Sequence, residues 1–232
     1  LKLKFNPQLR LDLLDDVLDL AGFRIDLNGM GIEMKGEISK LSSKMPKLDR
    51  VDIKTHGIDL TRVFKLFPQA RAALPRGAQV GGPVVALVRV SGDAEGQALN
   101  LSVNLNGLML KIPNTINKPA GERLELNLRA LLSPSKVRLK KLEFAVSDLK
   151  LTTRGEVAPK SGRLALTGEI PPFKINRIMR LLPSVSAAIP PKVKIDGEGA
   201  LKFMVETRAK GITLNLETSI RNANLNTPEV RL

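Results

Sequence analysis

The chain lacks several residue types on which common functional sites depend. It has no cysteine, no tryptophan and no tyrosine, and His56 is its only histidine. The absence of cysteine excludes disulfides, thiol catalysis and zinc–thiolate sites, and a single histidine excludes metal sites that need a histidine pair. No run of about 18 apolar residues occurs, so no segment of this chain is predicted to cross a membrane as a helix.

The remaining polar residues show no catalytic arrangement. His56 is predicted to be a solvated loop residue beside a helix start, and a Ser-His-Asp triad would have to use it. Asp15-Asp16 is interpreted as a turn rather than a cation site. Gly29-x-Gly31 lacks the third glycine of a dinucleotide-binding motif and is also interpreted as a turn. We therefore predict that the chain is not an enzyme and that it holds no metal and no cofactor.

The chain has a net charge of +14 and a pI near 10.2. Such a surface attracts nucleic acid, lipopolysaccharide or anionic lipid headgroups. The basic residues are scattered, and the densest group, Lys136 to Lys141, is short. Because aromatic side chains that could stack on bases are nearly absent, a solvated basic face is favoured over nucleic-acid binding.

One stretch of sequence occurs twice. Ile58 to Pro113 aligns without a gap to Phe173 to Pro228, 115 residues further on, and about a quarter of the positions are identical. Self-similarity at a fixed period indicates stacked units rather than one closed globule. The identical pairs include Pro68 with Pro183 and Leu101 with Leu216.

The rest of the chain fits the same repeat at an offset of 119 residues. Met30 to Ile38 matches Leu149 to Val157, and Leu9-Arg10 matches Leu128-Arg129. We interpret 1–57 as the C-terminal part of a first unit, 58–172 as a complete unit and 173–232 as the N-terminal half of a further one, in one continuous elongated domain. On this interpretation the chain is part of a longer protein.

Alternation of apolar and polar residues at period two dominates the sequence. Leu99, Leu101, Val103 and Leu105 alternate with polar residues, and their repeat partners do the same. This pattern predicts antiparallel strands with one apolar and one polar face. The parity changes across Lys140-Lys141, which predicts a β-bulge.

Each unit has one helical interruption. The segments after Thr61 and Asn176, which are predicted N-caps, read RVFKLF and RIMRLL, and Pro68 and Pro183 are expected to break each helix and start a second short piece. So little helix cannot cover an apolar sheet face. Either the sheet curls so that this face lines a groove, or the face packs on itself as a closed core. Both alternatives stay open at this point.

The units resemble the AsmA family of Gram-negative envelope proteins, relatives of the TamB-type and bridge-like lipid transfer proteins. The resemblance rests on the helices that end in LFP and LLP (63–68 and 178–183), on the passage from Leu74-Pro75 to Gly82 and from Ile189-Pro190 to Gly197, and on Lys118 to Gly121 with the strand that follows. It implies a mostly β fold, a repeating antiparallel β-groove with one short amphipathic helix per repeat of about 115 residues. It also implies a periplasmic location, anchored to the inner membrane through a segment outside this chain.

These observations together predict a groove that binds phospholipid or another acyl lipid. The expected function is to carry acyl chains between the inner and outer membrane, with these membranes or their proteins as partners and without nucleic acid. The alternative is a non-catalytic structural or outer-membrane assembly module with a self-packed core and a basic surface for protein or lipopolysaccharide. The predicted groove lining comprises Ala86, Val88, Val90, Leu99, Leu101, Val103, Leu105, Leu124, Leu126, Leu128, Leu201, Phe203, Val205, Leu214, Leu216 and Ile220.

Overall fold

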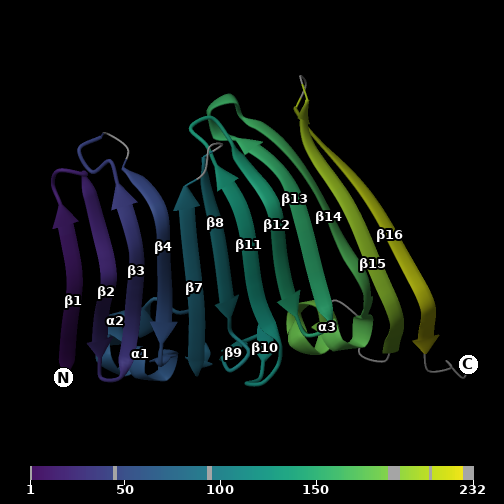
Figure 1. Ribbon diagram of the computed structural model, residues 1–232. Helices are drawn as coiled ribbons and strands as arrows, with labels where there is room; N and C mark the ends of the chain where they lie inside the picture. The colour runs from purple at the N-terminus through teal and green to yellow at the C-terminus, as the bar shows by residue number, and fades with distance from the viewer. Residues whose placement is uncertain (1, 44–45, 93–95, 188–193, 209–210, 227–232) are drawn as a thin grey trace, which may run out of the picture.

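The computed structural model describes residues 2–43, 46–92, 96–187, 194–208 and 211–226, and it consists largely of one antiparallel sheet (Figure 1). The sheet is curved and open, with β1 and β16 at its two ends and no closure into a barrel. The predicted mostly β, groove-like fold is thereby confirmed. The strands of the main sheet are β1 (Leu3–Asp12), β2 (Val17–Leu27), β3 (Met30–Ser39), β4 (Lys47–His56), β5 (Ile58–Asp59), β7 (Pro83–Gly92), β8 (Gln97–Asn104), β11 (Leu124–Leu132), β12 (Val137–Val146), β13 (Leu149–Ala158), β14 (Arg163–Lys174), β15 (Lys194–Arg208) and β16 (Gly211–Asn226).

Neighbouring strands in this sheet are also neighbours in the chain. The pairing order is β1-β2-β3-β4-β7-β8-β11-β12-β13-β14-β15-β16, and β5 pairs with β7. A small second sheet contains β6 (Gln79–Gly81), β9 (Met109–Ile112) and β10 (Ile116–Lys118). The described helices are α1 (Leu60–Leu66), α2 (Pro68–Ala72), the 3₁₀ helix η1 (Pro159–Ser161), α3 (Ile175–Leu181) and α4 (Pro183–Ala187). The α-helices and the small sheet gather at one end of the strands (Figure 1).

The two copies of the repeat form the same elements in the same register. Val51 on β4 pairs with Val90 on β7, and Leu166 on β14 pairs with Val205 on β15, which are the positions 115 residues later. The helices of the second copy, α3 and α4, also contact β10 of the first. Contacts between adjacent units are typical of repeat proteins, in which each unit is stabilised by its neighbours.

A proline breaks each helical segment, as predicted. Pro68 and Pro183 stand at the first position of α2 and α4, where their missing N–H leaves no hydrogen bond unmade. The predicted N-caps were wrong. The N-cap of α1 is Asp59, whose carboxylate accepts from the Thr61 and Arg62 amides, and α3 begins after Lys174 without a side-chain cap. Thr61 and Asn176 lie one residue inside their helices.

Thr61 and Asn176 instead connect each helix to the beginning of the next long strand. The Thr61 hydroxyl accepts a hydrogen bond from the Gly82 amide at 3.2 Å. The Asn176 amide donates to the Asp196 carboxylate at 3.0 Å. These two polar residues, at equivalent repeat positions, therefore fix the helix against the sheet, a tertiary role that the local N-cap pattern does not distinguish.

Bulges in β2 and β12 bend the sheet at equivalent places. The register shifts between Leu20 and Phe23 in one strand and between Leu139 and Leu142 in the other, which confirms the bulge expected at Lys140-Lys141. A bulge increases local twist and curvature. Gly36 and Gly155, the glycines of the repeated Gly-Glu pairs, lie opposite these bulges.

The alignment of Leu9 with Leu128 is wrong by two residues. Leu9 pairs with Leu20 and Ala130 pairs with Leu139, so Leu9 is structurally equivalent to Ala130. The cause is one extra residue pair, Asp12 with Val17, at the end of the β1–β2 hairpin, since the turns after β1 and after β11 both have four residues. Asp15 and Asp16 lie in this turn, as predicted, and the Asp16 carboxylate accepts hydrogen bonds from Ser42.

Lys118 is the largest fully buried side chain among the described residues, only 1% exposed. Its ammonium group donates to the carbonyl oxygens of Leu108 at 2.5 Å and of Asn106 and Pro119 at 3.2 Å. Burial lowers the pKa of this ammonium, against a smaller opposing effect of Glu122. Lys118 thus closes the loop between β8 and β9 by satisfying three carbonyl groups at once.

Replacing Lys118 by methionine should destabilise this region. The substitution keeps the length of the side chain but removes the ammonium donor from the buried Leu108 carbonyl oxygen, whereas those of Asn106 and Pro119 also accept from the Gly121 and Glu122 amides. We expect a loss of about 2 kcal/mol in the free energy of unfolding, measured by urea denaturation. Lys111→Met is the control, because Lys111 is exposed on β9 of the same small sheet. Equal unfolding midpoints for the two variants would contradict this role of Lys118.

Candidate functional site: the apolar face of the sheet

Strand pairing places the predicted groove residues on one face of the sheet. Directly opposed residues in adjacent strands share a face, and Val88 pairs with Leu101, which pairs with Leu128. Parallel rows run through Val90, Leu99 and Ala130, and through Ala86, Val103 and Leu126. In the second copy, Phe203 pairs with Leu216, Val205 with Leu214 and Leu201 with Thr218.

The last members of the predicted set follow from the same registers. Leu105 donates its amide to the Leu124 carbonyl at 2.9 Å, at the end of the row next to Val103 and Leu126. Ile220 pairs with Gly199. It lies on the same face as Leu216, because the two residues are four positions apart in the same strand and side chains alternate between faces. The structure therefore brings all of the predicted lining residues together.

The apolar face is wider than the predicted set. Leu128 pairs with Leu142 and Leu126 with Phe144, so the rows continue across β12. On the other side, Val88 pairs with Ile53 and Val90 with Val51. The further apolar residues on this face of β12, β13 and β14 are Val137, Leu139, Leu142, Phe144, Val146, Leu149, Leu151, Val157, Leu164, Leu166 and Ile170. The alternation of these residues with polar ones was visible in the sequence. That they belong to one surface could be seen only once the strand order was known.

The strands before β7 extend the same face to the N-terminal edge. Phe23 pairs with Met34, which pairs with Ile53, and Ile25 pairs with Ile32. On β1, Phe5 pairs with Ile25, and its ring meets that of Phe23 edge-on with centroids 5.3 Å apart. The face is thus continuous from one end of the main sheet to the other.

The side chains of this face are only partly shielded from solvent. Leu101 and Leu128 are half-buried, Phe144 is 36% exposed and Leu216 is 58% exposed. Twelve paired strands lie about 4.8 Å apart, and each carries about five apolar residues on this face. These dimensions give a surface on the order of 1,000 Å². Exposed apolar patches on soluble monomers rarely exceed a few hundred Å², so this face is large enough to be a binding surface.

Phe203 is the aromatic residue of the predicted set, and a glycine makes room for its ring. A Cβ atom built on Gly168, its partner on β14, would lie 2.3 Å from the ring. The ring therefore occupies the space next to Gly168 that a side chain would otherwise fill. The rest of the predicted set is aliphatic, and the wider face adds the rings of Phe5, Phe23 and Phe144 and hydroxyl groups such as those of Thr55 and Thr153.

The opposite face is polar, and several of its charges are paired. Arg89 donates to Asp52 at 2.6 Å, and Glu143 accepts from Lys150 at 2.6 Å and from Lys141 at 3.0 Å. The hydrogen bonds from Lys150 and Lys141 lower the pKa of Glu143, and the hydrogen bond to Asp52 raises the pKa of Arg89. Both groups therefore stay ionised at neutral pH.

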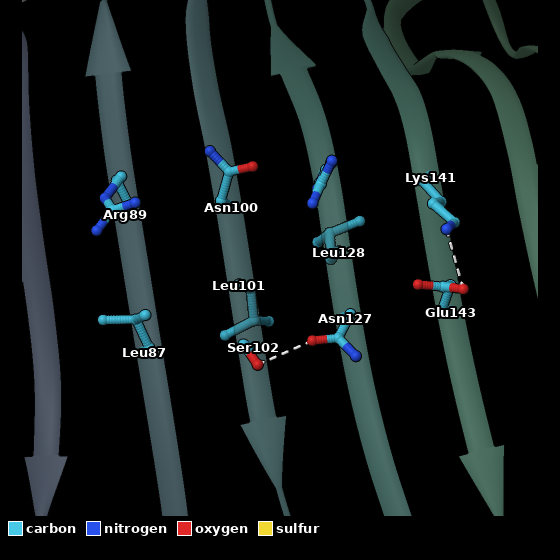
Figure 2. A pocket seen from close by; sticks show the side chains of 10 residues that line it. Leu87, Arg89, Asn100, Leu101, Ser102, Asn127, Leu128, Lys141 and Glu143 are labelled. Atoms are coloured by element: carbon cyan, nitrogen blue, oxygen red, sulfur yellow. Dashed lines mark hydrogen bonds and ion pairs between the residues drawn. The ribbon is translucent and has the colours of Figure 1, made fainter.

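A shallow depression of about 300 Å³ lies on this polar face across β7, β8, β11 and β12 (Figure 2). Arg89, Asn100 and Arg129 follow one another in the same cross-strand row, and Lys141 is next. Ser102 donates to Asn127 at 2.8 Å beside them. The depression carries more cationic than anionic groups, which fits the basic surface expected from the composition.

His56 is not a loop residue, contrary to the prediction. It is the last residue of β4, and its Nε2 lies 3.0 Å from the Glu33 carboxylate on β3. Because both residues belong to adjacent strands, this contact is an ordinary cross-strand pair at the sheet surface. Within the described part of the chain, no group of three or more histidine, cysteine, aspartate or glutamate residues could hold a metal ion.

No described helix is long and apolar enough to cross a membrane. Comparison of the chain with protein-family models, with curated proteins and with solved structures gave no match.

Proposed function

We propose that the apolar face is a lipid-binding groove that carries phospholipid acyl chains. The observation that supports it best is the continuous, mostly aliphatic surface that runs from strand to strand, on which most residues are only half-buried. Each methylene buried on such a surface is worth about 0.8 kcal/mol, and acyl chains need no directional hydrogen bonds there. A lining of leucine, valine and isoleucine meets this requirement.

The proposal extends to transport on the basis of the AsmA-type resemblance. On that basis acyl chains move passively along the groove between the inner and outer membrane, across the periplasm, with the headgroup at the open rim near lysine and arginine side chains. The proposed partners are the two membranes or their proteins. The proposed anchor to the inner membrane lies in a segment outside this chain.

Native mass spectrometry of the purified chain, followed by lipid extraction, tests the proposal. We expect phospholipid to be bound at a defined stoichiometry. A mass without bound lipid, together with a cooperative thermal transition, would contradict the groove and favour the alternative.

The alternative is a non-catalytic assembly module that acts through its basic face. The depression formed by Arg89, Asn100, Arg129 and Lys141 is the specific observation in its favour. This function predicts binding of protein or lipopolysaccharide that weakens strongly with salt, because the contacts are between exposed charges. Lipid held by the apolar face should remain bound at the same salt concentrations.

A further inference from the structure

The α-helices of the two repeats lie at one end of the strands (Figure 1). In each repeat the chain forms two short helices there before the next long strand: α1 and α2 precede β7, and α3 and α4 precede β15. The two helical segments are six strands apart in the pairing order, which corresponds to about 29 Å along the sheet. We call this end of the sheet the helical rim and define it by residues 60–76 and 174–187.

The first helix of each repeat presents two cations to solvent. The apolar residues of α1 are half-buried, whereas Arg62 and Lys65 are exposed. In α3, Leu181 is buried and Arg177 and Arg180 are exposed. Residues three apart lie on the same side of a helix. Since Arg62 and Lys65 are 115 residues before Arg177 and Arg180, the two repeats carry the same pair of cations at equivalent positions.

The rest of the helical rim adds cations and no acidic residue. Arg71 and Arg76 follow α1, Lys174 precedes α3, and all three are exposed. No ion pair joins any cation of the rim to a carboxylate within the described part of the chain. The neighbouring carboxylates of Asp59 and Asp196 already accept hydrogen bonds from within the protein. A partner that pairs with these cations must therefore be anionic.

An exposed aromatic ring lies among these cations. Phe67 stands between α1 and α2 and is 52% exposed. Every residue of α2 is exposed as well, and this helix packs mainly on α1, so little of the protein covers the segment. Phenylalanine together with lysine and arginine on one exposed segment is typical of elements that bind at the interface between membrane and water.

The opposite rim of the sheet carries charges of both signs. The turn between β1 and β2 contains Asp15 and Asp16, which an anionic surface repels. Lys160 and Arg163 lie at the turn between β13 and β14. The helical rim, whose charged residues are all cations, is therefore the better match to an anionic surface.

We propose that the helical rim docks on the surface of a membrane that contains anionic phospholipid. The cations of α1 and α3 lie near headgroup phosphates, and the ring of Phe67 enters the interface. Each such cation raises the affinity for an anionic membrane about fivefold, so the several cations of the rim together hold the protein there. A nucleic acid offers similar charge, but its bases stack on several exposed aromatic rings, and Phe67 is the only exposed one among the rim's described residues. The proposal does not depend on what the apolar face binds.

Sedimentation with vesicles tests the proposal. One set of vesicles contains equal parts of phosphatidylglycerol and phosphatidylcholine, and the other contains phosphatidylcholine alone. The two sets offer similar acyl chains, so any lipid that the apolar face extracts contributes equally to both. We expect the chain to sediment with the anionic vesicles, less so as the salt concentration rises, and to remain largely in solution with phosphatidylcholine. Equal binding to both sets would overturn the proposal.

Arg62→Gln combined with Lys65→Gln should weaken binding to the anionic vesicles about tenfold or more. Lys160→Gln combined with Arg163→Gln is the matched control, because it removes the same charge from the opposite rim. All four side chains are exposed, so both variants should fold. We expect the control to change the affinity less than about twofold. Equal losses in the two variants would show that net charge alone decides binding, which contradicts a docking rim.

Phe67→Trp gives a second measurement, because the chain contains no tryptophan of its own. We expect the emission of this tryptophan to shift to shorter wavelength when anionic vesicles are added, since the ring leaves water. Ser135→Trp, in the exposed turn after β11 at the opposite rim, is the control and should show no shift. Equal shifts, no shift in either variant, or tighter binding of duplex DNA than of the anionic vesicles would each overturn the proposal.

Discussion

Leu101→Asp combined with Leu216→Asp should abolish lipid binding while the β content stays largely intact. The two leucines occupy equivalent positions in the two repeats, and both lie on the apolar face, Leu101 on the inner strand β8 and Leu216 on the terminal strand β16. An acyl chain that passes over these positions would meet two carboxylates that cannot be desolvated without cost. We expect the amount of phospholipid that co-purifies to fall about tenfold or more.

The fold should tolerate these substitutions better than a sealed core would. Leu216 is already 58% exposed on the edge strand β16, and Leu101 is only half-buried between Val88 and Leu128. An aspartate at either position can therefore keep contact with water. Circular dichroism measures whether the β content is retained, and lipid extraction with mass spectrometry measures the bound lipid.

Asn100→Asp combined with Asn215→Asp is the matched control. These residues precede the two leucines in the same strands, so they lie on the polar face and the change in charge is the same. The control should retain its lipid. If the leucine variant is folded and still carries lipid, the apolar face is not the binding surface. If the control loses lipid to the same degree, net charge rather than the face decides binding.

Gly155→Ala should produce a large loss of stability for a single substitution in the sheet. Gly155 has a φ of +148°, and a Cβ atom there would lie 2.0 Å from the Ala165 carbonyl oxygen on β14. The backbone cannot keep this pairing with a side chain present. We expect the free energy of unfolding to fall by about 3 kcal/mol or more. Gly36, the equivalent residue on β3, is in the same position relative to the Arg50 carbonyl.

Gly162→Ala separates the steric clash from the backbone conformation. Gly162 also has a positive φ, +65°, but no atom lies within 4 Å of the Cβ position. Its substitution should therefore cost only about 1 kcal/mol. Urea denaturation compares the two variants. A Gly155→Ala variant no less stable than Gly162→Ala would show that the close approach of β13 and β14 is not a constraint.

The local pattern of the sequence was sufficient to predict the strands and their faces. Alternation at period two assigns each residue of a strand to a face without knowledge of its neighbours, so Leu99 to Leu105 and their repeat partners could be placed correctly. The bulge at Lys140-Lys141 was equally local, because it appears as a change in parity. The glycine of each Gly-Glu pair was noticed only as a repeated element, and its close contact with the next strand was not visible.

Interactions between distant segments account for what could not be predicted. Thr61 and Asn176 fit the N-cap pattern, but they form hydrogen bonds with Gly82 just before β7 and with Asp196 near the beginning of β15. His56 has a partner only because β3 and β4 pair in a particular register. Lys118 is buried because three carbonyl groups converge on it from residues up to 12 positions away.

The sequence by itself determined that this protein is a repeat of amphipathic strands, because periodicity is a property of neighbouring residues. Only the tertiary structure decided that the sheet of described strands stays open and that its apolar rows join into one surface. Those properties depend on strand order, on register and on which elements cover a face. Each of them is set by contacts between residues far apart in the chain. The alternation of apolar and polar residues within one strand carries no information about such contacts.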